Sequence, residues 1–238
     1  STSGSRDWRS ILIGGLRAGG KGYFALDITD PADFGTTTTE ARNTVLWEFT
    51  NYDDGDLGYT FSQPIIAKTN NGKWAAIFGN GYNSTNGLAK LFILFIEEGL
   101  DGWSSSDYIE IDTGIGSSSD KNGLSSPAVI DLDDDGIADR VYAGDLKGNM
   151  WAFDISASNT GNWKIAHKTG STYYPLFTAE DSSGNAQPIT SAPLIASNKN
   201  NVPSSNSNAP NSLVLFGTGQ YITNADLSDL NGQSFYTV

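Results

Sequence analysis

The sequence predicts an all-β fold, a modified and partial β-propeller, from its composition, a four-strand repeat and glycines at the tight turns. Of 238 residues, 27 are Gly and only 17% are charged, whereas 11% are aromatic. This composition favours short strands joined by many turns over long helices with charged faces. We expect a single β-propeller fragment over residues 1–238, since all-β domains of this length are commonly undivided.

The repeat begins with two strands. A proline turn precedes a short apolar strand in three segments: Ser62–Ile66, Ser126–Ile130 and Ser191–Ile195. A polar turn then leads to a second strand that ends in small residues, in these segments: Ala75–Gly81, Arg140–Asp145, Leu213–Gly219 and, one repeat earlier, Ile11–Gly15.

Two further strands complete the repeat. The third carries an aromatic residue that we expect to pack in the core: Phe24 in Gly22–Asp27, Phe92 in Leu91–Phe95 and Trp151 in Asn149–Asp154. The fourth is expected at Val45–Phe49, Tyr108–Ile111 and Trp163–Ala166. Four antiparallel strands in each repeat, at intervals of roughly 60–65 residues, are typical of propeller blades. We expect about three blades plus pieces of neighbouring blades, and a sandwich of similar hairpins is the alternative.

The connections between strands vary in length. Polar, low-complexity composition predicts mobile surface loops at Thr36–Thr39, Ser104–Gly123 and Ser197–Ser212. Single helical turns are expected at Pro31–Phe34 and Ala225–Leu230.

The longest apolar block has the length of a strand, well below the ~18–20 residues of a membrane span. We therefore expect no membrane span in this chain, and its end inside an apparent strand suggests an excised fragment.

Charge and cysteine content exclude some functions. The net charge is −13, and the sequence shows no cluster of Lys and Arg, so nucleic-acid binding is not expected. The chain has no cysteine, which excludes disulfides and thiolate metal sites.

The segment Asp131–Asp139 (DLDDDGIAD) is the sharpest chemical signal. Five carboxylates within nine residues repel one another unless a cation neutralises them. Positions 1, 3 and 5 of the loop are Asp131, Asp133 and Asp135. Gly136 permits a sharp turn, Ile137 can offer its backbone carbonyl, and Asp139 closes the site.

This spacing follows the ligand order of an EF-hand loop without the flanking helices. It differs at the twelfth position, where Tyr142 replaces the bidentate Glu, so the ninth residue must complete the set. An all-oxygen set favours Ca²⁺ over Zn²⁺ or Cu²⁺, and Mg²⁺ prefers fewer protein ligands. The alternative is an acidic hairpin turn that binds nothing. Asp134 is expected to face solvent, and Asp145 to belong to a neighbouring turn.

No catalytic or cofactor-binding residues are predicted, so we do not expect an enzyme. The acidic stretch Asp53–Asp56 lacks the spacing of a full ligand set and is interpreted as an exposed turn. His167 is the only histidine, and a surface position is expected for it. The glycine-rich stretch Gly14–Gly22 joins strand to strand, so it cannot hold a phosphate as a P-loop does.

Several of these blocks together resemble the C-terminal propeller of the PilY1/PilC family of type IV pilus proteins. The resemblance rests on these segments: Trp8–Leu16, Gly22–Asp27, Asp56–Ser62, Asn71–Tyr82, Asp135–Asp139, Tyr142–Leu146, Trp151–Asp154, Gly217–Tyr221 and Gln233–Tyr236. It implies a calcium loop with the ligands inferred above: Asp131, Asp133, Asp135, Ile137 through its carbonyl, and Asp139.

The resemblance also implies a location and partners. It indicates a bacterial surface protein at the pilus tip, exported through the periplasm and outer membrane. Its implied partners are pilins, minor pilins and the pilus assembly machinery, with a host-cell or surface receptor as a further partner. In the family, the calcium site supports pilus biogenesis by opposing retraction, and the protein contributes to adhesion and twitching motility.

Two other classes of protein have propellers with similar features. An integrin-like propeller has similar calcium loops, but usually several of them, whereas this chain has one. A quinoprotein dehydrogenase also has Trp motifs in its blades, but it requires a quinone pocket on the axis of the ring.

Overall fold

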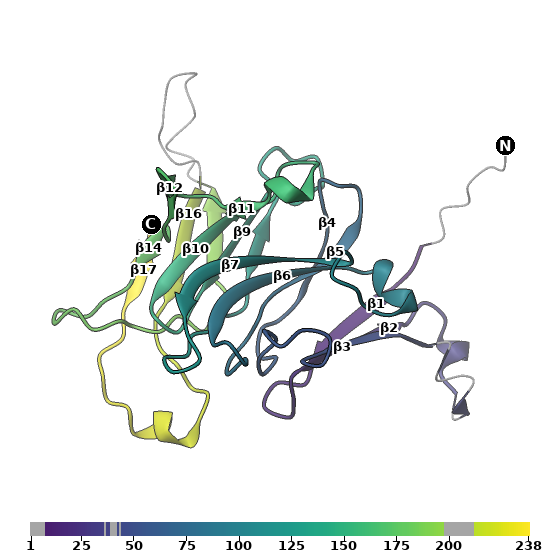
Figure 1. The fold of residues 1–238 in the computed structure, drawn as a ribbon, viewed down its shortest axis with the longest axis horizontal. Helices are drawn as coiled ribbons and strands as arrows, with labels where there is room; N and C mark the ends of the chain where they lie inside the picture. Colours follow the sequence, from purple (N-terminus) through teal and green to yellow (C-terminus); the bar gives the residue numbers. More distant parts are fainter. Residues whose placement is uncertain (1–7, 36, 39–41, 43, 198–211) are drawn as a thin grey trace.

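A computed structural model of the chain describes residues 8–35, 37–38, 42, 44–197 and 212–238. Its strands form four antiparallel sheets that follow one another along the molecule, from β1–β3 near the N-terminus to β15–β17 near the C-terminus (Figure 1). A separate hairpin is made by β12 and β13. No helix among the described residues is long and apolar enough to cross a membrane.

The strands of the first two sheets are β1 (Ile11–Gly15), β2 (Gly22–Asp27), β3 (Val45–Thr50), then β4 (Ile65–Lys68), β5 (Trp74–Gly79), β6 (Leu88–Phe95) and β7 (Tyr108–Gly116). Those of the third sheet are β8 (Ala128–Ile130), β9 (Arg140–Gly144), β10 (Asn149–Asp154), β11 (Lys164–Ile165) and β14 (Phe177–Thr178). The remaining strands are β12 (Lys168–Thr169), β13 (Thr172–Tyr173), β15 (Leu194–Ser197), β16 (Ser212–Gly217) and β17 (Phe235–Thr237).

The predicted all-β propeller architecture is confirmed. Each sheet pairs its strands in chain order, as blades do, and the second sheet has the complete order β4-β5-β6-β7. The two expected helical turns are present as the 3₁₀ helices η1 (Pro31–Asp33) and η4 (Asn224–Ser228), and two more occur at η2 (Glu98–Asp101) and η3 (Thr160–Asn162).

Two details differ from the sequence-based expectations. The segment 104–123 is not one long loop, because β7 occupies Tyr108–Gly116 and pairs with β6 along most of its length. The fourth strand expected at Trp163–Ala166 is reduced to β11, and β14 pairs with the other end of β10. The expected loop at Ser197–Ser212 falls mostly outside the described residues, as does part of Thr36–Thr39.

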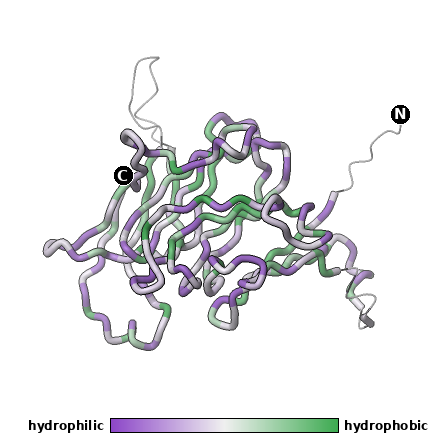
Figure 2. The backbone as a smooth tube through the Cα atoms, in the orientation of Figure 1, coloured by the Kyte–Doolittle hydropathy of each residue, from purple (hydrophilic) through white to green (hydrophobic). Residues whose placement is uncertain are grey.

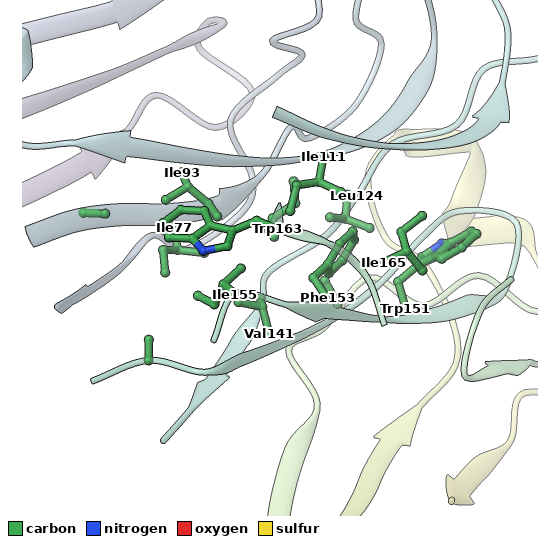
Figure 3. Close-up of a cluster of buried hydrophobic side chains, with 14 of the residues drawn as sticks. Ile77, Ile93, Ile111, Leu124, Val141, Trp151, Phe153, Ile155, Trp163 and Ile165 are labelled. Carbon is green, nitrogen blue, oxygen red and sulfur yellow. The ribbon is translucent and has the colours of Figure 1, made fainter. Parts of the chain in front are cut away.

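Hydrophobic residues concentrate on the strands and polar residues on the connections (Figure 2). The buried side chains form one cluster between each pair of successive sheets. Between the second and third sheets, for example, Ile77 and Ile93 belong to one cluster with Val141, Trp151 and Phe153 (Figure 3). This face-to-face burial of neighbouring sheets is the main source of stability in a propeller.

The aromatic residues of the third strands differ in how deeply they are buried. Phe92 and Trp151 are fully buried, as expected, whereas Phe24 is only half-buried and covers Gly14. The small residue at the end of the second strand has a packing role. A Cβ at Gly79 would lie 2.2 Å from the carbonyl oxygen of Ser125, so only glycine fits where the next sheet begins.

Candidate metal centre

The acidic loop is the connection between β8 and β9. These strands pair antiparallel, and the pair Ile130 and Arg140 closes the loop at its base. Val141 is fully buried in the core between the second and third sheets, and Val129 packs against that core. The two ends of the loop are therefore fixed by strands that belong to the core.

Asp131 organises the loop through its carboxylate. Its Oδ1 accepts the backbone N–H groups of Asp133, Asp134 and Asp135 at 3.2, 2.8 and 3.3 Å, and its Oδ2 accepts that of Gly136 at 2.6 Å. These bonds, that from Gly136 above all, lower the pKa of the Asp131 carboxyl. The first aspartate is thus held ionised and sets the curvature of the loop.

Two residues take the left-handed backbone conformation that the tight turn requires. Gly136 has φ 85° and Asp134 has φ 63°. Glycine adopts this conformation without steric cost, and aspartate tolerates it better than most residues. The side chain of Asp134 is exposed, as expected, and Asp135 Oδ1 accepts the N–H of Ile137 at 2.8 Å.

The loop brings three carboxylates together. One oxygen from each of Asp131, Asp133 and Asp139 lies within 4.8 Å of the other two. Oxygens that share a Ca²⁺ ion lie about 2.3–2.6 Å from it, so this spacing allows all three to bind one ion. Repulsion from Asp135, reinforced by partial desolvation and by Asp139, raises the pKa of Asp133. The geometry and charge of the three groups therefore fit a hard divalent cation.

Of the five expected ligands, the structure gathers Asp131, Asp133 and Asp139. Asp135 lies close enough to act electrostatically on Asp133, but it is not in the compact group. The parts assigned to Asp135 and to the Ile137 carbonyl stay predictions.

The end of the loop is tied to the preceding blade. Asn70, in the β4–β5 turn, donates its side-chain N–H to Asp139 Oδ1 at 3.2 Å and to the carbonyls of Ala138 and Ile155 at 3.0 and 3.3 Å. Asp139 Oδ2 accepts the N–H of Leu132 at 2.9 Å. Sequence reasoning missed Asn70, because its partners lie in another repeat and an asparagine beside a hairpin turn is common.

The acidic stretch Asp53–Asp56 is a turn, as expected, but it is exposed only in part. Asp54, Asp56 and Glu110 lie close together, and Asp56 is buried. Lys90 Nζ pairs with two of them, 2.5 Å from Asp56 Oδ2 and 2.7 Å from Glu110 Oε2. Burial disfavours the charge on Lys90, but the bonds to both acids outweigh burial and raise its pKa. This cluster carries its own cation and is a structural ion pair.

Asp145 lies outside the metal centre, in the turn where it was expected. Its fully buried carboxylate accepts the indole N–H of Trp151 and the side-chain N–H of Asn122, both at 2.9 Å. Asn149 donates its backbone and side-chain N–H groups to the same carboxylate. Asp145 therefore fixes the β9–β10 turn and joins it to the strand connection before it.

The remaining candidates show no catalytic arrangement among the described residues. His167 is half-buried and stacks on Tyr174, with ring centroids 5.8 Å apart. The glycine-rich stretch runs from the end of β1 through its turn to the start of β2, as predicted.

In the part of the chain that the structure describes, these sheets and the loop Asp131–Asp139 define a β-propeller with a candidate calcium site. The family model described as the PilY1 beta-propeller domain matches residues 2–238. A type IV pilus biogenesis factor PilY1 homolog of Xylella fastidiosa is 41% identical over 94% of this chain, and PilY1 of Pseudomonas aeruginosa strain PAO1 is 40% identical over 92%. The chain spans only 15% and 18% of those two proteins.

A solved structure is similar to this chain in both fold and sequence. The crystal structure of the Pseudomonas aeruginosa PilY1 C-terminal domain has a TM-score of 0.78 and 38% identity, covering 97% of this chain and 45% of that one. The chain belongs to the PilY1 β-propeller family, which confirms the resemblance to that family seen in its sequence. Its relatives are named as pilus biogenesis factors, which favours the pilus hypothesis over the integrin-like and quinoprotein alternatives.

Proposed function

We propose that this chain is the calcium-binding propeller region of a pilus-associated surface protein, and that it has no catalytic activity. The observation that carries the calcium proposal is the convergence of Asp131, Asp133 and Asp139 within 4.8 Å in a loop with EF-hand spacing. Asp135 and the Ile137 carbonyl complete the proposed ligand set. When bound, Ca²⁺ supplies the positive charge that relieves the repulsion between these carboxylates.

The ion acts on the contact between two blades. Asp139 lies at the junction, with Asn70 of the second blade on one oxygen and the loop backbone on the other. Without the ion, repulsion between Asp133 and its neighbours favours a looser loop. Calcium therefore stabilises one arrangement of the β8–β9 connection against the β4–β5 turn, and biases the equilibrium between two local states.

For the whole protein, we propose support of pilus biogenesis at the pilus tip on the cell surface. The names of the relatives support this role. In this proposal the calcium-bound propeller opposes pilus retraction, contributes to twitching motility and surface attachment, and meets pilins, minor pilins or the assembly machinery. A host-cell or surface receptor is a further proposed partner.

Two adjacent substitutions test this function. Asp133→Asn removes a proposed ligand charge, and Asp134→Asn makes the same chemical change on an exposed side chain with φ 63°, which asparagine tolerates. We expect isothermal titration calorimetry to show calcium binding lost in the first variant and kept in the second.

In the full-length protein, Asp133→Asn should also reduce surface piliation, while Asp134→Asn should not. Normal piliation together with lost calcium binding would exclude the regulatory role and leave the metal site standing. Calcium binding that both variants keep would exclude the metal site itself.

A further inference from the structure

Equivalent turns of all four sheets meet at one cavity of about 440 Å³. One corresponding turn from each sheet lines it. These turns contribute Ala18 from β1–β2, Tyr82 from β5–β6, Leu146 from β9–β10 and Ile222 from β16–β17. The β1–β2 turn and the β16–β17 connection with η4 both lie at the lower edge of the molecule in Figure 1. We call this hollow the rim cavity. Its volume is in the usual range of ligand pockets, about 300–1,000 Å³.

The apolar wall of the rim cavity is held in place before any ligand arrives. Tyr59 and Tyr82 exchange backbone hydrogen bonds of 2.6 and 3.2 Å. The rings of Phe61 and Tyr82 lie 5.7 Å apart, and Tyr82 is 5% exposed. A preformed wall avoids the entropy cost of ordering side chains on binding.

One cation, Lys121, lines this cavity and two more lie beside it, although the chain as a whole is acidic. Lys21 Nζ donates to the carbonyl of Asn83 at 2.6 Å, and Lys121 Nζ donates to Asn83 Oδ1 at 2.5 Å and to the carbonyl of Ser84 at 3.1 Å. The guanidinium of Arg17 lies 5.6 Å from the ring centroid of Phe61. Within the described part of the chain, none of these three cations forms an ion pair with a carboxylate.

The positive charges of Lys21 and Lys121 repel each other. Burial, and after it the charge of Lys121, lowers the pKa of Lys21. Both ammonium groups converge on one asparagine whose acceptors are neutral, so an anion placed between them would relieve their repulsion.

Asp226 also lines the cavity, and hydrogen bonds from neighbouring residues already stabilise its negative charge. Its carboxylate accepts the backbone N–H groups of Ile222 and Thr223 at 2.9 and 2.7 Å, and the side-chain N–H of Gln220 at 2.7 Å. These bonds lower its pKa to about 2. Close to the cavity, Lys147 pairs with Asp120 at 2.5 Å. Lys121 is the lining cation and Asp226 the lining carboxylate, while Lys21 and Arg17 add two cations beside the lining residues Asn83 and Phe61.

We propose that the rim cavity binds an acidic peptide segment of a partner protein. A carboxylate of the segment lies between Lys21 and Lys121, and a neighbouring apolar side chain packs against Tyr59, Phe61 and Tyr82. In an extended peptide, residues two positions apart present their side chains on the same face, so an acid and an apolar group can reach the cavity together. A polysaccharide of uronic acids supplies carboxylates but no side chain for the apolar wall, and inorganic phosphate supplies charge alone.

The probe for this proposal is a library of fluorescein-labelled pentapeptides, each with Asp or Glu between apolar residues. Its control is the same library with Asn or Gln in place of the acid. Binding to the 238-residue chain is followed by fluorescence anisotropy, with alginate and inorganic phosphate as competitors. We expect members of the acidic library to bind at least tenfold more tightly than their amide counterparts, and 0.5 M NaCl to weaken them.

The decisive variant is the double substitution Lys21→Gln with Lys121→Gln, which should reduce affinity about tenfold or more. The matched control, Lys164→Gln with Lys168→Gln, makes the same charge change on exposed residues of β11 and β12 and should leave affinity within twofold. Ile222→Ser should weaken binding about fivefold by removing apolar contact.

Failure of the whole acidic library to bind, equal binding of the amide library, or no effect of the Lys21 and Lys121 variant would overturn the proposal. Binding of alginate or phosphate without peptide binding would overturn it as well. The rim cavity does not include the loop Asp131–Asp139, so the calcium proposal stands or falls independently.

Discussion

Asn70 Nδ2 donates a hydrogen bond to Asp139 Oδ1 at 3.2 Å and so joins the β4–β5 turn of one blade to the acidic loop of the next. The same amide also binds two backbone carbonyls of the third blade. The backbone adds a bond of 2.9 Å from the Ala138 N–H to the Lys68 carbonyl. The proposed calcium site is therefore part of an interface between blades.

Asn70→Ala should weaken calcium binding about tenfold, because Asp139 loses the contact that orients it. It should also lower the free energy of unfolding by about 1–3 kcal/mol, since acceptors at the interface lose their partner. Calorimetric titration and urea denaturation measure the two effects. Asn185→Ala is the control, because Asn185 makes the same kind of bond to Asp181, at 2.8 Å, in an exposed turn. An unchanged calcium affinity in Asn70→Ala would show that the contact between blades does not support the site.

Calcium affinity should fall in mild acid. The pKa of Asp133 is raised above its ordinary 3.8, so this carboxylate takes up a proton at a higher pH than a free aspartate. Protons compete with the ion for ligand oxygens. For the ion-free protein the sign is opposite: a raised carboxyl pKa destabilises the folded state at neutral pH, and protonation relieves this as pH falls. Titrations from pH 7 to pH 4 check the first effect, and an affinity that stays constant over this range would contradict it.

Lys90→Met should destabilise the second blade by roughly 3–5 kcal/mol at pH 7, because it leaves Asp56 and Glu110 without their cation. Urea denaturation measures the loss. In the unchanged protein the raised pKa of Lys90 stabilises the folded state fully below the unfolded value of 10.5, and this contribution disappears as pH rises through the folded pKa. Lys164→Met, on an exposed strand residue, is the control. A loss as small as that of the control would show that the buried pair contributes nothing.

Asp145→Asn should destabilise the third blade by on the order of 3 kcal/mol, because the new amide N–H faces donors from Trp151, Asn122 and Asn149. Asp181→Asn, in an exposed turn, should cost far less. Thermal unfolding of the two variants compares them. If calcium affinity fell sharply in Asp145→Asn while stability held, Asp145 would belong to the metal site instead of the fold.

Much of the fold was predictable because short-range pattern determines it. The alternation of apolar residues and the recurring turns located β1, β2, β5, β9 and β10 to within two residues. The length of β7 was not predictable in this way, since its later residues, Asp112–Gly116, are polar or glycine apart from Ile115. They are strand residues only because β6 offers a pairing edge.

In the candidate site too, some features follow from short-range sequence pattern and others depend on tertiary packing. The spacing of Asp131, Asp133 and Asp139 along the chain was enough to predict that they converge. Asn70 and the Lys90 cluster could not be found in the same way. Their partners lie at least 20 residues away along the chain, and only tertiary packing brings them together.

We propose that the loop Asp131–Asp139 holds one calcium ion. An anomalous difference map from a crystal of this chain grown in millimolar calcium measures this most directly. We expect one peak, within about 2.3–2.6 Å of carboxylate oxygens from Asp131, Asp133 and Asp139. A well-ordered loop with no peak, and with these side chains turned into solvent, would contradict it.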